Sequence, residues 1–501
     1  MSDTNDNSRN WHDAAAAIAI DGRAWIEGER VAARDGATFE VMSPIDGRLL
    51  GTAARGTAAD VDAAVASARR AFDDGRWSRQ SPAARKRVLM RFAEGILAAR
   101  DELALLETLD MGKPIQYSRS VDVPAAARCI QWYAEAIDKV YDEIAPTAHN
   151  ALATITREPM GVIGCIVPWN YPMIMAAWKL GPALATGNSV VLKPSEKSPL
   201  SAMRLAEIAL AAGLPAGVFN VVPGYGHEAG EALALHMDVD AIGFTGSTRV
   251  GRRMFEYASR SNLKRVYNEL GGKSANLVFA DFNDLERAAA TAAGSMFFNQ
   301  GESCNAPSRL FVQSSIADEF VARLTALTPR YMPGDPLDER TVMGALVDAT
   351  QLSTVMGYIE AGMGEGARCL VGGNRARGGS GGFYVEPTLF DRVDNQMKIA
   401  REEIFGPVLS VIRFDTEEEA VAMANDSSYG LQAAVWSSNL DRAHRVARAL
   451  RAGTVHVNQY DDDDITVPFG GYKQSGNGRD KSLHALEKYT ELKTTWIRLS
   501  M

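Results

Sequence analysis

One cysteine stands in a setting that suits covalent chemistry. Cys304 lies in the polar segment 299–309 (N-Q-G-E-S-C-N-A-P-S-R), between a predicted helix and a predicted strand. Cys165, by contrast, lies within an apolar run, and the chain has neither a C-x-x-C pair nor a histidine at metal-ligand spacing from a cysteine. No metal site is therefore expected. A thiolate that attacks a carbonyl carbon requires an oxyanion donor and, for turnover, a base. The loop setting makes Cys304 a candidate nucleophile, with a structural cysteine as the alternative.

Two further side chains could complete such a reaction. Asn170 lies in the segment 167–172 (V-P-W-N-Y-P), where two prolines stiffen the loop and the side-chain amide can donate to an oxyanion. Glu269 ends a predicted strand in the segment 268–272 (N-E-L-G-G), and a partly desolvated carboxylate there suits a general base. An asparagine that shapes a turn and a solvated carboxylate are the structural alternatives.

Three segments resemble parts of a nucleotide site. The segment 244–248 (F-T-G-S-T) follows an apolar strand and precedes a helix, so free N–H groups near Gly246 would suit a pyrophosphate. An ordinary helix cap is the alternative. Lys193 and Glu196 end a strand, where they would bind ribose hydroxyls or form a solvated ion pair. The segment 224–230 (G-Y-G-H-E-A-G) has one residue too many before its last glycine and fails as a G-x-G-x-x-G fingerprint.

Alternating strands and helices would position these residues. Apolar runs predict strands at 162–167, 189–192, 218–222, 241–245 and 265–269. Helical patterns lie between them at 172–185, 199–212, 228–236 and 249–259. This βαβ succession predicts a parallel sheet with helices on both faces. Further strands are expected at 276–279, 309–312, 433–436 and 454–457, which indicates a second α/β domain that starts near Gly272.

The composition excludes several classes of protein. Of the 501 residues 46% are hydrophobic and 23% are charged, as is typical of a globular protein. The net charge of −9 argues against a broad nucleic-acid surface. The uncharged stretch 159–178 contains three prolines, so we expect a buried strand, a loop and a helix rather than a membrane span. Four cysteines without a disulfide pattern, and no visible secretory signal, predict a cytoplasmic protein.

Together the motifs resemble those of the NAD(P)-dependent aldehyde dehydrogenases. The matching segments, in family order and spacing, are P-W-N-Y-P (168–172), K-P-S-E (193–196), F-T-G-S-T (244–248), E-L-G-G-K (269–273), the loop around Cys304 and E-E-I-F-G-P (402–407). Within the family, the chain is most similar to the γ-glutamyl-γ-aminobutyraldehyde dehydrogenases of bacterial putrescine catabolism. That similarity lies in the segments W-Y-A-E-A-I-D-K-V-Y (132–141), K-P-S-E-K-S-P-L-S-A (193–202) and V-P-F-G-G-Y-K-Q-S-G-N-G-R-D-K-S-L-H-A-L-E-K (467–488).

The resemblance implies a role for each matching residue. Cys304 would form a thiohemiacetal and then a thioester, with the oxyanion between the Asn170 amide and its own N–H. Glu269 would activate the hydrolytic water, and Lys179 would help to shape the active site. The cofactor would be NAD, with NADP as a second possibility, bound by Ile166, Trp169, Lys193, Glu196, Gly226, Phe244, Gly246, Ser247, Glu403 and Phe405. The aldehyde would contact Tyr171, Trp178, Phe298, Ser303 and Phe469; Asp463 is a further candidate contact at a position that departs from the family pattern.

The resemblance also implies an α/β fold in three parts. A Rossmann-like, parallel-sheet NAD-binding domain would take residues 1–139 and 159–271. An α/β catalytic domain would take 272–474, and a small β oligomerisation extension would take 140–158 and 486–501. Similar proteins are homodimers or homotetramers, and this chain is expected to be one or the other.

Two departures from the family pattern bear on function. Pro307 stands where the family usually has glycine, so the loop after Cys304 is expected to be stiffer or differently placed. The segment 461–464 is four aspartates, and Asp463 or a neighbour is hypothesised to attract a substrate ammonium; a solvated acidic loop is the alternative. Other functions stay open, namely a CoA-acylating dehydrogenase, which would not need Glu269, a cofactor-independent cysteine esterase and a catalytically silent homologue.

Overall fold

The first of the two large sheets carries most of the expected nucleotide-binding segments. The computed structural model describes residues 9–460 and 464–500. Its eight-stranded sheet has the order β2-β1-β9-β8-β7-β10-β11-β21. The strands are β2 (Glu29–Val31), β1 (Ala24–Ile26), β9 (Phe219–Val221), β8 (Ser189–Lys193), β7 (Val162–Ile166), β10 (Ala241–Thr245), β11 (Arg265–Glu269) and β21 (Gly476–Asn477). The strands from β9 to β11 are parallel, and each of the five predicted strands here is confirmed to within one residue at either end.

Helices connect these strands as the alternation predicts. They are α7 (Pro172–Ala185), α8 (Leu200–Ala211), α9 (Glu231–Leu235) and α10 (Thr248–Ser259). The prediction of one α-helix over 228–236 is wrong in part, because a π-helical turn (Gly226–Gly230) precedes a shorter α9. The two glycines of that turn have weak helix propensity, which the apolar pattern does not register.

The second sheet has seven strands in the order β14-β17-β18-β13-β12-β19-β20. The strands are β14 (Arg368–Val371), β17 (Thr388–Asp391), β18 (Val408–Phe414), β13 (Arg309–Gln313), β12 (Ala275–Val278), β19 (Gln432–Trp436) and β20 (Thr454–Val457). All except β14 run parallel. Its helices include α11 (Leu285–Phe297), α12 (Ser314–Leu327), α13 (Ala349–Gly364), α15 (Glu417–Asn425) and α16 (Leu440–Ala449). The four predicted strands of this half are confirmed, whereas β14, β17 and β18 were not predicted.

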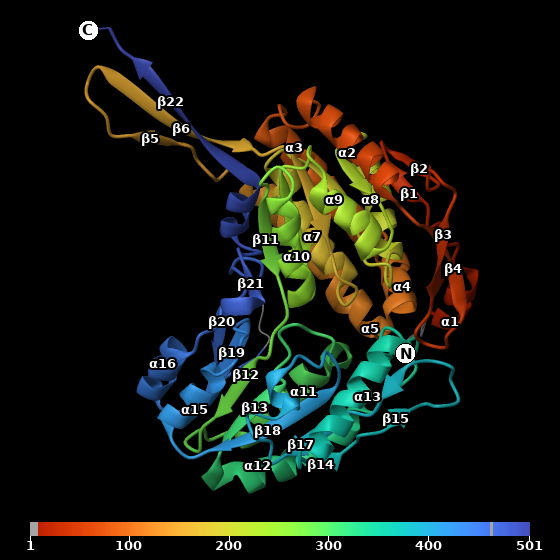
Figure 1. The fold of residues 1–501 in the computed structure, drawn as a ribbon, viewed down its shortest axis with the longest axis vertical. Helices are drawn as coiled ribbons and strands as arrows, with labels where there is room; N and C mark the ends of the chain where they lie inside the picture. Colours follow the sequence, from red (N-terminus) through yellow and green to blue (C-terminus); the bar gives the residue numbers. More distant parts are fainter. Residues whose placement is uncertain (1–8, 461–463, 501) are drawn as a thin grey trace, which may run out of the picture.

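Further elements from the N-terminal part of the chain pack around the first sheet (Figure 1). They are α1 (Trp11–Ala17), β3 (Thr38–Met42), β4 (Leu49–Ala54), α2 (Ala58–Asp73), α3 (Pro82–Ala98), α4 (Arg100–Met111), α5 (Ile115–Tyr117) and α6 (Val123–Ala136). The short elements α14 (Lys398–Arg401), β15 (Arg375–Ala376) and β16 (Tyr384–Val385) belong to the second half. The bundle α3, α6 and α7 is a large apolar core, with α6 buried along one side.

The two sheets face each other through the ends of their strands. In the first sheet the candidate residues follow the strands: Asn170 follows β7, Glu196 follows β8, and Glu269 ends β11. In the second sheet they precede the strands, because the Cys304 loop leads into β13 and Glu403 comes before β18. The candidate site therefore lies where the carboxyl ends of the first sheet meet the amino ends of the second. For the first sheet this is the edge at which parallel α/β proteins usually bind ligands.

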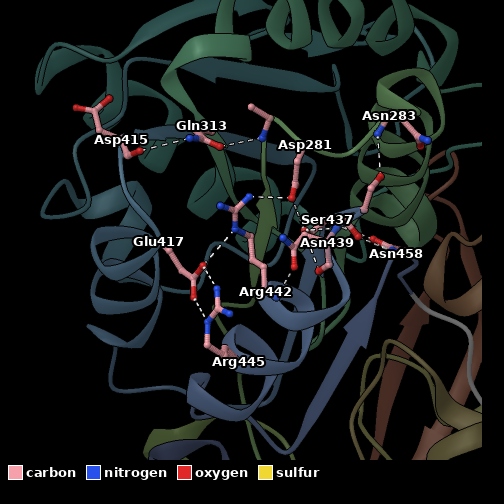
Figure 2. A network of polar contacts seen from close by, with 12 residues as sticks. Asp281, Asn283, Gln313, Asp415, Glu417, Ser437, Asn439, Arg442, Arg445 and Asn458 are labelled. Carbon is pink, nitrogen blue, oxygen red and sulfur yellow. Dashed lines mark hydrogen bonds and ion pairs between the residues drawn. The ribbon is translucent and has the colours of Figure 1, made fainter.

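At the carboxyl ends of the strands in the second sheet, a polar network joins the neighbouring loops and helices (Figure 2). Asp281, after β12, accepts hydrogen bonds from Ser437 and Arg442, and Arg442 also contacts Glu417 at 3.1 Å. Arg445 adds two hydrogen bonds to the same Glu417 carboxylate, each 3.0 Å long. These contacts fix α15 and α16 to the strand ends, so this edge is structural.

A three-stranded antiparallel sheet projects from the body (Figure 1). It consists of β5 (Glu143–Ala145), β6 (Ala151–Pro159) and β22 (Thr490–Arg498), in the order β22-β6-β5. β5 and most of β6 lie within the segment 140–158, and β22 lies within the segment 486–501, the two segments expected to form a β extension. Leu483–Tyr489 forms a 3₁₀ helix that packs against α7, and the strand starts at Thr490.

The uncharged stretch 159–178 folds as the sequence predicts. It forms β7, a proline-containing loop and the first half of α7, all of them largely buried in the protein. Within residues 9–460 and 464–500, no helix combines the length and apolar character needed to cross a membrane.

Candidate active site

Hydrogen bonds between two loops place Cys304. The turn Phe298–Gly301 precedes it, and Asn299 has a left-handed backbone with φ 48°. The Asn299 side chain donates to the carbonyls of Asn170 (3.0 Å) and Glu302 (3.2 Å). The Asn170 amide also donates to the Glu302 carbonyl, at 2.8 Å. The Cys304 loop is therefore tied directly to the loop that follows β7.

Asn170 is suited to hold an oxyanion. Its side chain is buried, and the bond to the Glu302 carbonyl fixes its orientation. An amide carries two N–H donors, so the second remains for an oxygen atom on a substrate. A donor that is already oriented loses little freedom when negative charge develops, and this is how oxyanion holes lower barriers.

The glycine pair 271–272 permits close packing at the centre of the site. A Cβ at Gly272 would lie 2.2 Å from the Cys304 carbonyl oxygen, and one at Gly271 would lie 2.2 Å from a Glu403 carboxylate oxygen. The Gly272 N–H donates to the Glu403 carboxylate at 3.0 Å. The segment E-L-G-G thus lets both the nucleophile loop and Glu403 approach β11.

Glu269 is a buried acid with an unusual protonation equilibrium. Its Oε1 atom has no hydrogen-bond partner among the described residues. Burial, and secondarily the charge of Asp480, raise the pKa of Glu269 to about 8, against the opposing effect of Lys179 and Lys488. A carboxyl group that titrates near neutral pH can accept and release a proton during turnover.

The Cys304 thiol is protonated in the resting protein. Burial raises the pKa of Cys304 well above its ordinary value, and the carboxylates of Glu269 and Glu403 add to this. Burial likewise raises the pKa of Glu403 to about 7. A proton must therefore leave the thiol when the sulfur attacks a carbonyl carbon.

Asp480 binds two lysines behind Glu269. Lys179, on α7, donates to one carboxylate oxygen of Asp480 at 2.5 Å, and Lys488 donates to the other. The pairing of β11 with β21 puts Glu269 opposite Gly476 and so brings this part of the chain to the site. Sequence analysis did not identify Asp480 or Lys488, because the signal for them lies in a tail motif about two hundred residues from Glu269.

The expected ribose-binding pair lies at the end of β8. Lys193 is buried and its ammonium group lies 3.0 Å from the Glu196 carboxylate. Burial favours the neutral acid, yet Lys193 holds the pKa of Glu196 below its ordinary value. This is a partly buried ion pair rather than the solvated pair of the alternative interpretation. Trp169 packs edge-on against Phe405 at 5.2 Å between ring centroids, next to the same strand ends.

The expected pyrophosphate segment needs a correction. The N–H of Gly246 is not free, since it donates to the Glu269 carbonyl at 3.1 Å. The Ser247 side chain caps α10 by accepting from Val250 at 3.4 Å. The donors left at this helix start are the N–H groups of Thr248 and Arg249. Gly226, at the start of the π-helical turn, faces open space, as no atom lies within 4 Å of where its Cβ would be.

Two of the expected cofactor residues are buried apolar side chains on neighbouring strands. Ile166 ends β7 and is buried, and Phe244 lies in β10 with its ring 2.6 Å from where a Gly246 Cβ would be. A side chain at position 246 would therefore displace the Phe244 ring, which explains the glycine.

A cavity of about 580 Å³ reaches Cys304 from the surface. Its walls come from α6, α7, the Cys304 loop and the segment 464–481. They include five of the six residues expected to contact substrate, namely Tyr171, Trp178, Phe298, Ser303 and Phe469. Asp463, the sixth, lies outside the described residues. The Tyr171 hydroxyl shares a hydrogen bond with Ser303, and Trp178 packs against Phe469 at 5.1 Å.

Three charged residues line this cavity; two of them were not predicted, whereas Asp464 belongs to the aspartate segment singled out in the sequence. The three are Arg128 on α6, Asp464 and Lys481. Lys481 lies over the rings of Trp178 (5.6 Å) and Phe469 (5.8 Å), and burial lowers the pKa of its ammonium group to about 8. Hydrogen bonds from Thr466, and to a smaller extent the charge of Arg128, hold the pKa of Asp464 below its ordinary value. The cavity is thus apolar near Cys304 and carries both signs of charge elsewhere on its walls.

Pro307 is accommodated within a tight turn after Cys304. The Ser308 N–H donates across it to the Ala306 carbonyl at 2.8 Å, and Ala306 itself donates to Ser303 at 3.2 Å. Since proline has no N–H and a fixed φ, it stiffens this turn before β13 without leaving a donor unsatisfied.

Comparison with known proteins agrees with this geometry. A model of the aldehyde dehydrogenase family matches residues 31–495. The NADP/NAD-dependent aldehyde dehydrogenase PuuC of Escherichia coli is 56% identical over 98% of both chains. The γ-glutamyl-γ-aminobutyraldehyde dehydrogenase structure from Burkholderia cenocepacia has a TM-score of 0.96 and 61% identity, over 98% of this chain and 99% of that one. An indole-3-acetaldehyde dehydrogenase of P. syringae, in complex with NAD+, has a TM-score of 0.97 and 60% identity over the same shares.

Proposed function

The chain belongs to the aldehyde dehydrogenase family, and we propose that it oxidises an aminoaldehyde to the carboxylic acid with reduction of NAD+. The observation that carries the proposal is one cavity that ends at Cys304, beside the oriented amide of Asn170 and the buried carboxyl group of Glu269. A nucleophile, an oxyanion donor and a base are the three groups that acyl chemistry on a thiol requires.

In this proposal Cys304 and Asn170 carry the first half of the reaction. The thiol loses its proton to solvent in the cavity as the sulfur attacks the carbonyl carbon, and the carbonyl oxygen becomes an oxyanion. The second N–H of Asn170 and the Cys304 N–H stabilise that oxyanion. Bound NAD+ supplies a hydride acceptor, so the two-electron oxidation converts the thiohemiacetal into a thioester on Cys304.

Glu269 carries the second half. It takes a proton from a water molecule while the oxygen attacks the thioester carbonyl carbon, and the Cys304 thiolate leaves. The product is the free carboxylic acid. Lys179 binds Asp480, a buried electrostatic neighbour of Glu269; in this proposal it shapes the site.

The residues at the strand ends suit a dinucleotide. Lys193 and Glu196 would hold ribose hydroxyls, and the helix start after Ser247 would face a phosphate. Gly226, Glu403 and the Trp169–Phe405 pair would complete the site, with Ile166 and Phe244 as its apolar walls. The Glu196 carboxylate would repel a 2′-phosphate, which favours NAD over NADP.

A direct assay of NADH formation tests the proposed function. The purified protein is expected to form NADH from γ-glutamyl-γ-aminobutyraldehyde and NAD+ without CoA, with a higher kcat/KM for NAD+ than for NADP+. A requirement for CoA would indicate the acylating reaction. Ester hydrolysis in the absence of any aldehyde oxidation would indicate a cysteine esterase, and no turnover at all would indicate a silent homologue.

The charges of the cavity support a substrate with both an ammonium and a carboxylate group. We expect Arg128→Met to lower kcat/KM about fivefold for γ-glutamyl-γ-aminobutyraldehyde, because partly exposed charge pairs are worth about 1 kcal/mol. Asp464→Asn should lower it by a similar factor. Neither should change kcat/KM for propanal, and equal losses for the charged and the uncharged aldehyde would contradict this assignment.

The division of the chain into domains is part of the same proposal. The eight-stranded sheet would belong to the NAD-binding domain, the seven-stranded sheet to the catalytic domain, and the projecting sheet to the oligomerisation extension. On the projecting sheet, Trp496 is 67% exposed and Leu492 65% exposed, so a second copy that covered them would bury apolar surface. A solution mass of one chain by light scattering would contradict a homodimer or homotetramer. The cytoplasmic location expected from the composition also remains a proposal.

A further inference from the structure

A buried cluster of three charged side chains lies behind Glu269. Asp480 is 1% exposed at its side chain, and each of its two carboxylate oxygens accepts from a different ammonium group. Lys179 binds Oδ2 at 2.5 Å, and Lys488 binds Oδ1. Burial lowers the pKa of Lys488, against the opposing effect of Asp480. A single lysine would be enough to neutralise this aspartate, so a protonated Lys488 gives the cluster a net positive charge.

Lys488 is held firmly in its place. It belongs to the 3₁₀ helix Leu483–Tyr489, and its side chain is 7% exposed. Its ammonium group lies 5.4 Å from the ring centroid of Tyr489 and 6.0 Å from that of Tyr267. Its Cδ atom lies 3.4 Å from where a Cβ of Gly478 would be. Tyr267 precedes Glu269 by two residues on β11, so the same strand supports both side chains.

Several charged side chains influence the ionisation of Glu269. Asp480 disfavours the ionised carboxylate, and Lys179, Lys488 and the more distant Arg479 favour it. Cys304 faces Glu269 from the second sheet. Burial alone would keep Glu269 protonated, because it is the largest influence and favours the neutral acid.

We propose that Lys488 is a positioning residue for the hydrolytic step, which holds Asp480 between two ammonium groups and thereby keeps a net positive charge beside the Glu269 carboxylate. The inference rests on the proposed role of Glu269 as the base for water. Lys488 itself touches neither the reacting carbon nor the nucleophile. Its charge raises the fraction of molecules in which Glu269 is ionised and able to accept a proton.

Loss of the Lys488 charge has a definite sign. With Lys179 still bound, Asp480 stays anionic and the cluster becomes neutral. Glu269 then loses one of the two lysines that favour its ionised form, and its pKa rises further above 8. At pH 7 fewer molecules carry an ionised Glu269, so thioester hydrolysis slows, whereas thioester formation on Cys304 is affected less.

Stopped-flow measurement of NADH between pH 6.5 and pH 9.5 tests the proposal with saturating NAD+ and aldehyde. In Lys488→Met, the fast NADH burst is expected to remain while the slow phase at pH 7 falls about tenfold. The midpoint of the pH profile of that phase should move up by about one unit, the usual effect of losing a nearby charge. Lys488→Arg, which keeps the charge, should restore the wild-type midpoint.

Lys264→Met is a matched control. Lys264 is also a buried lysine, but it lies before the opposite end of β11 and donates to the carbonyls of Ala234 and His236, both at 2.7 Å. It should leave the pH midpoint unchanged. Lys488→Gln, which keeps a donor for Asp480 without the charge, serves if Lys488→Met does not fold. An unshifted midpoint in a folded, uncharged variant overturns the inference, whereas absence of any NADH formation by the wild type would overturn the proposed function instead.

Discussion

Replacing Cys304 with alanine is expected to abolish NADH formation, with kcat reduced by roughly 10⁴-fold or more, as when other covalent nucleophiles are removed. Without the sulfur there is no thiohemiacetal, and a hydrated aldehyde would not be held covalently with its oxygen at the Asn170 amide. Steady-state NADH absorbance at several aldehyde concentrations measures the effect. NAD+ affinity, measured by quenching of tryptophan fluorescence, should change little, because Cys304 does not belong to the strand ends that would hold the cofactor.

Cys369→Ala provides the matched control for this substitution. Cys369 is, like Cys304, a partly buried cysteine, but it lies on β14 at the outer edge of the second sheet. Its replacement should leave kcat within about twofold, since substitutions away from the site rarely alter transition-state contacts. Substantial NADH formation by Cys304→Ala, or its loss in Cys369→Ala, would contradict the assignment of the nucleophile.

The strands could be predicted because local pattern and tertiary environment agree. A run such as Val162–Ile166 is apolar throughout, as a strand buried on both faces must be. By contrast β14 has an exposed and partly buried pattern, and β17 has only two apolar residues, between Thr388 and Asp391, so neither gives a strong signal. The 3₁₀ helix at Leu483–Tyr489 was missed for a different reason, since its residues read equally well as the start of the strand that follows.

The chemistry of the site was predictable only where one short segment carries it. Cys304, Asn170 and Glu269 each lie in a distinctive local sequence, and the structure brings them to the same pair of sheet edges. Contacts between distant segments gave no such signal. The bond from Gly246 to the Glu269 carbonyl, which removes an expected phosphate donor, depends on the register of β10 with β11.

Some charged residues of the site were also missed, because distant segments bring them together. Lys488 reads locally as one lysine in a charged tail, and nothing near it in the sequence indicates burial. Only the pairing of β11 with β21 and the fold of the tail bring it to Asp480. Arg128 likewise lies on a helix whose sequence gives no hint that one face lines a cavity.

The second large effect is expected for Glu269→Gln, which should separate the two halves of the reaction. The amide cannot accept a proton from water, so turnover should fall by roughly 10²- to 10⁴-fold, the usual contribution of a general base. Thioester formation does not need that step. Stopped flow should therefore show a burst of NADH equal in amount to the active sites, followed by almost no further increase.

The pH profile and a chemical rescue make this prediction specific. In the wild type, ionised Glu269 increases with pH through its pKa of about 8, so the hydrolytic phase should rise about tenfold per pH unit below 8 and level off above it. In Glu269→Gln that rise should disappear. Hydroxylamine, which attacks thioesters without a base, should restore NADH turnover in the variant. Glu417→Gln alters a carboxylate in the polar network at the remote strand ends of the second sheet and should keep the wild-type profile. A Glu269→Gln variant that forms no burst would show that Glu269 acts before the thioester forms. A burst that hydroxylamine does not follow with further turnover would contradict an accumulated thioester.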